Sequence, residues 1–381
     1  MTKKAILAVL ATTMMITVVF TGCLGSSSGE GWTQDDLVTP DFQVEDDPSP
    51  VLPTPLSPLT FPYSYRLVWT ITEVYESYGG IANISLENTG TNTIYIYRFG
   101  VNWVNSTINS TRDTSVFIQS GEIQDLGMVF FRSPTGSSGH YEIHIWLCVS
   151  NAGETKWHDY GEKVGTNRSC DLVPRLTEET NYTEEKNPAN YFDKVNEKVV
   201  YDAVKAVISE IQAEYPLNHS INQIVGAFEW VRDNIEYVAD QGTDYWQSAG
   251  ETLDKGTGDC EDQAILITSI FGALGLNGRV NIIEYHAFAT VFVSDSLSGL
   301  ANVEEVIRSM YWTDLPICYL HDDMGYWLVT DTTGFFYTGG LPAKSCPMEG
   351  STLDAWTFEN TSYLVMVDAT GQTGGFDIWP F

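Results

Sequence analysis

Alternating apolar and polar positions dominate residues 60–172. Short runs rich in β-branched and aromatic residues are separated there by turn residues such as Asn88-Thr89-Gly90 and Ser120-Gly121. Alternation with a period of two residues is typical of strands that bury one face against a second layer. We therefore predict an all-β sandwich domain over 60–172. Its expected strands include 65–71, 81–86, 93–97, 116–118, 128–131 and 141–147.

The spacing of apolar residues changes after residue 190. Over 191–215 they recur at the intervals of an amphipathic helix. A further helix face is formed by Cys260, Ala264, Ile267, Phe271 and Leu274. Asp259 is a good N-cap for this helix, so Cys260 is expected in its first turn. The helix dipole and unpaired N–H groups of that turn favour a thiolate.

A thiol, an imidazole and a carboxylate follow one another along this half of the chain. His286 opens an alternating strand over 286–293, and Asp331 ends a strand-like run that begins at Tyr326. One helix and two strands can bring the side chains of Cys260, His286 and Asp331 together. Such a set supplies a nucleophile, a base and an orienting group. The alternative for Cys260 is a buried structural cysteine on an apolar helix face.

These motifs resemble the core of the transglutaminase-like superfamily. The ordered set comprises 244–253, 258–264, 286–288 and 331–333, and the resemblance covers about residues 185–381. It implies a papain-like α+β fold in which Cys260 attacks a carbonyl carbon, His286 exchanges the proton and Asp331 orients the imidazole. It also implies that the Cys260 backbone N–H holds the oxyanion, with support from Trp246 or Gln247.

The separation between His286 and Asp331 is wider than in the commoner pattern of this family. We interpret residues 295–324 as an insertion that contains a helix-like stretch over 303–310. Long insertions are often functional, so this one is a candidate lid. His321, close to Asp331, is a rival base. We favour His286, because His321 lies among turn-like residues and opens no strand.

The amino terminus resembles a lipoprotein signal. Lys3 and Lys4 precede an apolar run over 5–20, and a small-residue processing site ends in Cys23. We predict that 1–23 is a signal peptide, that Cys23 carries a lipid, and that the protein is tethered at the extracellular face of the membrane. A plain signal peptide or an uncleaved anchor helix is the alternative. Residues 24–59, rich in Ser, Pro and acids, are predicted to form a disordered tether.

The remaining cysteines suggest disulfides in an oxidising exterior. Setting aside Cys23 and Cys260 leaves four cysteines, which allow three connectivities. Domain order favours one bridge in each domain, and buried free thiols are the alternative. The two expected pairs are Cys148 with Cys170 and Cys318 with Cys346.

The charge and the missing motifs exclude several functions. The formal net charge is −31, with 50 acidic and 19 basic side chains, so nucleic acid is excluded as a partner. We interpret Asp259, Glu261 and Asp262 as ordinary first-turn partners of the helix dipole. The sequence carries no zinc motif, no EF-hand loop and no glycine-rich phosphate loop. We therefore predict no metal site and no cofactor.

The predicted fold class is α+β, with a papain-like transglutaminase core preceded by an all-β immunoglobulin-like sandwich. Residues 173–190 form a linker and 191–381 the transglutaminase-like domain. The expected reaction is acyl transfer at an amide of a protein or peptide substrate, through a thioester on Cys260. Hydrolysis by a protease or amidase is favoured. The alternatives are protein cross-linking and an inactive binding or scaffold protein, and the oligomeric state stays open.

Overall fold

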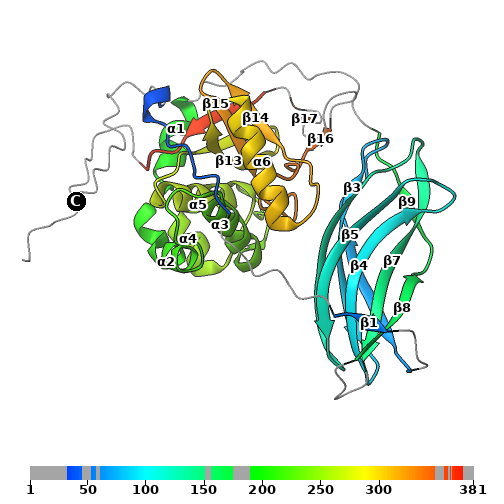
Figure 1. The fold of residues 1–381 in the computed structure, drawn as a ribbon. Coiled ribbons are helices and arrows are strands. Elements are labelled where there is room, and N and C mark those ends of the chain that lie inside the picture. Colours follow the sequence, from blue (N-terminus) through cyan, green and yellow to red (C-terminus); the bar gives the residue numbers. More distant parts are fainter. Residues whose placement is uncertain are drawn as a thin grey trace, which may run out of the picture.

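The computed structural model describes residues 32–44, 53–56, 61–150, 156–174, 189–347, 356–358, 361 and 363–371. A strand-rich part and a mixed part of helices and strands lie beside each other (Figure 1). Residues 1–31, which include Cys23 and the predicted signal, lie outside the described residues, as does most of the predicted linker. No helix in the described ranges is both long and apolar enough to cross a membrane.

Two sheets form the strand-rich part. The larger sheet has the order β1-β8-β7-β4-β5, with β9 paired to β7, and the smaller has the order β2-β3-β6. The larger sheet contains β1 (Pro55–Leu56), β4 (Thr93–Trp103), β5 (Asn109–Ile118), β7 (Ser138–Ser150), β8 (Trp157–Val164) and β9 (Arg168–Asp171). The smaller contains β2 (Tyr65–Ile71), β3 (Gly80–Asn88) and β6 (Ile123–Phe131).

The two sheets share one apolar core. Ile84 and Phe131 of the smaller sheet are buried in the same cluster as Phe99 and Ile145 of the larger sheet. Burial alternates along β2 and most of β3, so the period-two pattern places one face of the smaller sheet inward. The predicted all-β architecture of this part is confirmed.

The mixed part is built on a five-stranded antiparallel sheet of order β14-β15-β13-β12-β18. Its strands are β12 (Gly278–Ile283), β13 (His286–Ser294), β14 (Tyr319–Asp322), β15 (Gly325–Thr330) and β18 (Val365–Asp368). Two short pairs join β10 (Glu236–Tyr237) to β11 (Thr257–Gly258) and β16 (Ser345–Pro347) to β17 (Trp356–Phe358). The helices are η1 (Gln34–Asp36), α1 (Ala189–Asn196), η2 (Tyr201–Val204), α2 (Lys205–Glu214), α3 (Ile221–Asn234), α4 (Ala249–Lys255), α5 (Cys260–Ala273) and α6 (Leu297–Tyr311).

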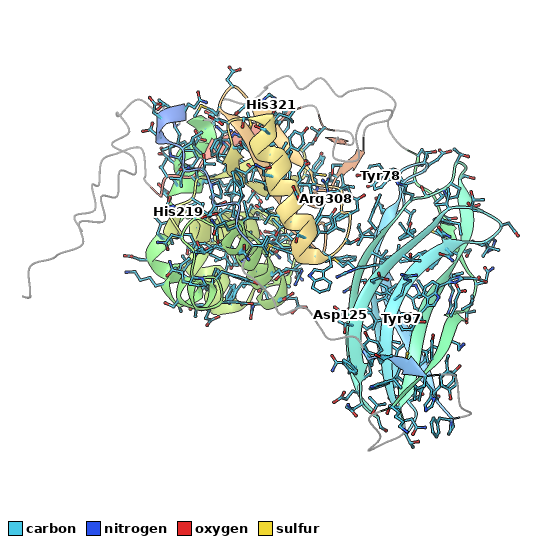
Figure 2. The ribbon with its side chains drawn as sticks, in the orientation of Figure 1. Tyr78, Tyr97, Asp125, His219, Arg308 and His321 are labelled. Carbon is cyan, nitrogen blue, oxygen red and sulfur yellow. The ribbon has the colours of Figure 1, made fainter. Side chains whose placement is uncertain are left out.

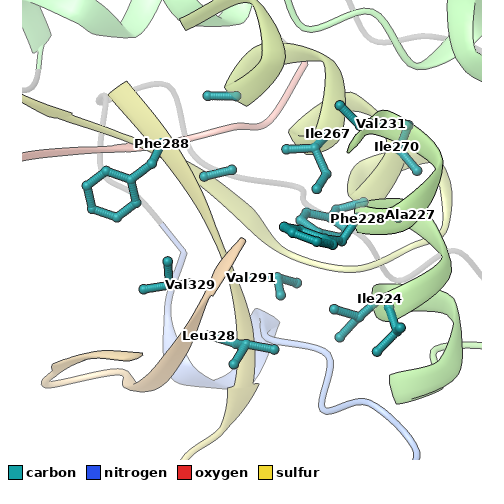
Figure 3. Packing of buried hydrophobic residues seen from close by; sticks show 14 of the residues in the cluster. Ile224, Ala227, Phe228, Val231, Ile267, Ile270, Phe288, Val291, Leu328 and Val329 are labelled. Carbon is teal, nitrogen blue, oxygen red and sulfur yellow. The ribbon is translucent and has the colours of Figure 1, made fainter. Parts of the chain in front are cut away.

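Helix α5 is the central element of the mixed part. Its residues from Glu261 to Phe271 are all buried, because it packs between α3 and α4 and against β12 and β13. Figure 3 shows Ile267 and Ile270 of α5 in the same cluster as Phe228 of α3 and Val291 of β13. The predicted α+β fold class is confirmed for the described residues.

The two parts also contact each other. Tyr75, Tyr78 and Phe130 of the strand-rich part belong to the apolar cluster of the mixed part. Figure 2 shows Tyr78 at the end of the sandwich that lies next to the mixed part. The hydroxyl of Tyr75 donates a hydrogen bond to the carbonyl of Ser345 at 2.9 Å. The sandwich is therefore packed against the second part and is not only linked to it.

A segment of the predicted tether is ordered against the mixed part. Asp41 forms a parallel bridge with Ser220, just before α3, and Phe42 packs on the core. The indole of Trp32 stacks on that of Trp327 with ring centroids 5.9 Å apart. Residues 32–44 therefore differ from the disordered tether expected over 24–59. The reason is that this acidic stretch carries two aromatic side chains that can be buried.

The predicted disulfide between Cys148 and Cys170 is wrong. Both thiols are free, and Cys170 pairs across the sheet with Gly139 of β7. Cys148 lies further along the same strand, about 30 Å from Gly139 at roughly 3.3 Å per residue. A disulfide needs Cα atoms within about 7 Å of each other. In the other pair Cys318 is buried, whereas the side chain of Cys346 is outside the described part, so that bridge stays a prediction.

Candidate active site

Cys260 is the first residue of α5, as the helical spacing predicts. Helix α4 is capped at its C-terminus by Gly256, whose φ of 64° lies in the left-handed region that favours glycine. The chain then forms β11, which pairs in parallel with β10, and turns into α5. Gly258 is required at this turn, because a Cβ atom there would lie 2.7 Å from the Cβ of Asp262. The turn and the short strand pair fix where the sulfur lies.

His286 and Asp331 meet on adjacent strands of the sheet. His286 is the first residue of β13, opposite Ile283 across a tight hairpin, and Asp331 directly follows β15. The Nε2 atom of His286 lies 2.8 Å from Oδ2 of Asp331, and both side chains are buried. The other ring nitrogen, Nδ1, remains for a partner on the opposite side.

His321 lies elsewhere. It is exposed on the edge strand β14 (Figure 2). Its ring stacks on that of Tyr326, the residue opposite to it in β15. Tyr326 is roughly 16 Å from Asp331 along the strand. The imidazole that contacts the Asp331 carboxylate is thus that of His286.

Several donors hold the Asp331 carboxylate. Thr333 donates to Oδ1 from its backbone N–H at 2.9 Å and from its hydroxyl at 2.7 Å. The backbone N–H of Ala343 donates to Oδ2 at 2.8 Å. Burial raises the pKa of Asp331, but the charge and hydrogen bond of His286 and these donors outweigh it, so the pKa lies below its usual value. The group is therefore a fixed, charged carboxylate.

The sulfur of Cys260 lies at the start of β13. The backbone N–H of Ala287, the residue after His286, donates a hydrogen bond to it. The thiol itself donates to Oε2 of Glu261, with Sγ and Oε2 3.2 Å apart. The sulfur thus lies against the backbone of the residue that follows His286, where α5 packs on β13.

The thiol is not activated in the way that the sequence suggests. Burial raises the pKa of Cys260, and the nearby carboxylate of Glu261 raises it further. The Ala287 N–H lowers it only in part. The expected preference of a first helical turn for the thiolate is outweighed here by burial and by negative charge. In this state Cys260 is a thiol that is hydrogen-bonded to Glu261.

The three acids around Cys260 are buried. Burial raises the pKa of Asp259, of Glu261 and of Asp262, the last to about 6. Asp259 occupies the N-cap position of α5 as predicted, but its side chain forms no cap hydrogen bond. Its Oδ2 atom instead accepts from the backbone N–H of Asp240 at 3.3 Å. The three acids are therefore buried and hydrogen-bonded side chains, and not the ordinary first-turn partners of the helix dipole that the sequence suggests.

The residues suggested for oxyanion support are engaged elsewhere. Both Trp246 and Gln247 are buried. The indole N–H of Trp246 donates to Asp244 at 3.0 Å, and Nε2 of Gln247 donates to the carbonyl of Thr257 at 3.4 Å. The backbone N–H of Gln247 donates to Asp262 at 2.7 Å. In this state they shape the turn before α5.

Sequence reasoning missed the residues that join these elements. Gln263 of α5 donates to the carbonyl of Gly258 at 3.2 Å and accepts from the hydroxyl of Thr332 at 2.7 Å. This bridge ties the helix of Cys260 to the loop of Asp331. Gln263 and Thr332 belong to the quoted motifs, but only the fold reveals that they touch. Asp240, from the loop after β10, was missed as well.

Comparison with known proteins gives one family match. The profile of the transglutaminase-like superfamily matches residues 205–331. A search of the curated proteins finds no match for the chain. The matched range begins at α2 and ends at Asp331, so it contains Cys260, His286 and Asp331.

The solved structures that the comparison finds are distant in sequence from this chain. A protein of Cytophaga hutchinsonii described as a candidate cysteine protease is 11% identical, with 84% of this chain and 96% of that chain covered and a TM-score of 0.25. Red sea bream transglutaminase is 12% identical, with coverages of 74% and 51% and a TM-score of 0.22. The PapD-like domain of human CEP192 is 16% identical, with coverages of 34% and 100% and a TM-score of 0.18.

Proposed function

We propose, from the premise that residues 205–331 form a transglutaminase-like domain, that this protein is a cysteine-dependent acyl-transfer enzyme acting on amide bonds. The observation that carries the proposal is the buried contact of 2.8 Å between His286 and Asp331, with the sulfur of Cys260 against the neighbouring Ala287. A histidine whose one nitrogen is bound to a carboxylate is oriented to accept a proton at the other.

The proposed reaction starts with transfer of the Cys260 proton to Nδ1 of His286. The sulfur then forms a bond to the amide carbon, and the carbonyl oxygen takes the negative charge. Asp331 stabilises the imidazolium through its contact with Nε2. As the carbon–nitrogen bond breaks, His286 returns the proton to the leaving amine, and an acyl thioester stays on Cys260. Water attacks the thioester, releases the carboxylic acid and restores the thiol.

We favour hydrolysis of a protein or peptide substrate over cross-linking. Both reactions share the thioester and differ only in whether water or an amine attacks it. The test is to incubate the enzyme with a glutamine- and lysine-containing peptide and a primary amine, and to analyse the products by mass spectrometry. Acid or shortened peptides support hydrolysis. Amine-bearing products support cross-linking and contradict the favoured reaction.

Matched variants decide whether Cys260 carries the activity. Cys260→Ala is expected to lower the rate by about 10³-fold or more, because the nucleophile is lost. Cys170→Ala is the control, since Cys170 is a free thiol in the sandwich. It should leave the rate unchanged. Activity that survives Cys260→Ala would contradict Cys260 as the nucleophile, whereas an inactive wild type would support the alternative of a binding or scaffold protein.

We further propose that the protein is held at the extracellular face of the membrane by a lipid on Cys23. The basic and apolar residues before Cys23 support this location. Cys23→Ser should release the exported protein from membranes or block its processing. Unchanged retention in the membrane fraction after cleavage at another site would reject lipidation.

A further inference from the structure

A tyrosine next to the candidate base projects into the solvent. Tyr285 precedes His286 in the two-residue turn that joins β12 to β13. It is 89% exposed, the highest value among the exposed large apolar side chains of the described residues. Single exposed aromatic rings are ordinary on protein surfaces, so exposure alone assigns no role to this one. Its role follows instead from its backbone conformation and from the residues around it.

Tyr285 has a backbone conformation that suits glycine. Its φ is 61°, in the left-handed region where a Cβ atom crowds the following carbonyl oxygen. Two-residue hairpin turns usually have glycine or asparagine at such positions. A bulky aromatic residue there is strained, and strain of this kind is found mainly at functional sites. Because glycine would fit this turn without strain and the ring is almost fully exposed, folding does not explain the tyrosine.

A second exposed tyrosine lies at the same site. Tyr237 of β10 is 53% exposed, and its strand pairs with β11, which leads into Cys260. Burial raises the pKa of the Tyr237 hydroxyl, and the negative charges of Cys260 as a thiolate and of Asp331 raise it further. The hydroxyl is therefore close to the sulfur and to the carboxylate. Two exposed rings from different elements thus border the start of α5.

We infer that Tyr285 and Tyr237 form an apolar subsite next to Cys260 that binds a large apolar side chain of the substrate, above all an aromatic one. This step rests on the proposed acyl-transfer function. The backbone N–H of Ala287, two residues after Tyr285, donates to the sulfur. A side chain held against Tyr285 therefore places a neighbouring amide of the same peptide near Cys260. Paired aromatic rings also attract each other beyond the effect of the area that they bury.

A lysine or arginine side chain is the alternative occupant, because a cation also binds an aromatic face. Tyr245, in the loop after β10, has two such contacts. The Nζ atoms of Lys198 and Lys255 lie 5.8 Å and 5.4 Å from its ring centroid. The apolar occupant is favoured at the subsite because Val238, which follows β10, adds an aliphatic side chain that is 46% exposed. Burial of such surface is favourable only against another apolar group.

The test is whether a peptide protects Cys260 from alkylation. Three blocked peptides are compared, which share a central glutamine and have phenylalanine, alanine or arginine on both sides of it. Each competes with iodoacetamide at one fixed pH. Mass spectrometry measures the alkylation of Cys260, with the free thiol of Cys170 as the internal reference. The phenylalanine peptide should protect Cys260 at about tenfold lower concentration than the alanine peptide, as expected for burial of one aromatic side chain.

Matched variants assign this preference to the subsite. Tyr285→Gly should abolish it and leave the melting temperature unchanged or higher, since glycine fits the turn without strain. Tyr285→Phe keeps the ring and should behave as the wild type does, whereas Tyr237→Ala should weaken protection by the phenylalanine peptide. Trp312→Gly is the control and should keep the full preference. Trp312 follows α6, has a φ of 55°, is 48% exposed and lines a cavity with Glu214 and Val225.

Several outcomes would overturn the inference. These are equal protection by the phenylalanine and alanine peptides in the wild type, an unchanged preference in Tyr285→Gly, and stronger protection by the arginine peptide that depends on Tyr285. A lower melting temperature of Tyr285→Gly would give the ring a structural role and overturn it as well. Protection is measured without turnover. Peptides that protect Cys260 but stay intact on long incubation would therefore reject the acyl-transfer proposal and leave the subsite in place.

Discussion

The Asp331 carboxylate is surrounded by donors that only the tertiary fold provides. The sequence predicts that Asp331 follows a strand. It also distinguishes His286, which opens a strand, from His321, which lies among turn-like residues. The donors from Thr333 and Ala343 follow from how the loop after β15 closes. Asp240 likewise approaches Asp259 through a loop. Such contacts depend on loop geometry, for which residue spacing carries no signal.

The charge of Asp331 makes a pH-dependent contribution to stability. Its folded pKa lies below the unfolded value of about 3.9, so the contribution is present above that pH and is lost as the pH falls through the folded pKa. Asp331→Asn should therefore lower the free energy of unfolding by about 1–3 kcal/mol at neutral pH. The difference in the free energy of unfolding between the variant and the wild type should become smaller below pH 4.

Urea unfolding from pH 3 to pH 7 measures this difference. Asp113→Asn is the control, because Asp113 forms an exposed pair with Arg98 and such pairs contribute within about 1 kcal/mol. If the difference in unfolding free energy between Asp331→Asn and the wild type stays constant down to pH 3, the charge of the carboxylate does not cause the loss of stability.

At the scale of elements, one arginine joins four strands of the mixed sheet. Arg279 of β12 contacts Asp368 of β18 at 2.6 Å and Asp322 of β14 at 2.5 Å. Its guanidinium lies 3.5 Å from the ring centroid of Trp327 in β15. The side chain is 8% exposed. The partners are 43 and 89 residues away in the chain, so periodicity predicts the strands but not this contact.

Removal of Arg279 should destabilise the mixed part strongly. Arg279→Ala leaves two partly buried carboxylates without their partner, which costs about 3–5 kcal/mol. Arg279→Lys should recover only part of the lost stability. An ammonium group cannot contact both carboxylates and also stack on the Trp327 ring, as the planar guanidinium group does. Arg66→Ala is the control, since Arg66 forms an exposed pair with Glu87. Equal effects of the two alanine variants in urea unfolding would refute this role.

At the scale of the molecule, the spacing of apolar residues changes from that of strands to that of helices along the chain. This change predicts a sandwich followed by a mixed domain. It does not predict the contact between the two parts. Tyr75, Tyr78 and Phe130 read as ordinary strand or turn residues, yet they join the cluster of the other part. The sequence did not predict the ordered segment 32–44 either. Its acidic composition is typical of a disordered tether, although two aromatic side chains anchor it to the mixed part.

This contact predicts how a fragment behaves. Residues 177–381 should fold alone, because the three candidate catalytic residues and their supporting helices and sheet all lie within them. The melting temperature should be lower than that of the full chain by several degrees, since the apolar contact with Tyr75, Tyr78 and Phe130 is lost. Calorimetry of the two proteins checks this. An insoluble fragment would mean that the two parts form one folding unit.

The most direct test of the central claim is to locate the acyl group. The protein is mixed briefly with p-nitrophenyl acetate, quenched in acid and analysed by peptide mass spectrometry. If Cys260, His286 and Asp331 act as one unit, the acetyl group appears on Cys260, and His286→Ala slows its formation by about 10²–10⁴-fold. An acetyl group that forms equally fast in His286→Ala, or on Cys170 in place of Cys260, would contradict the account.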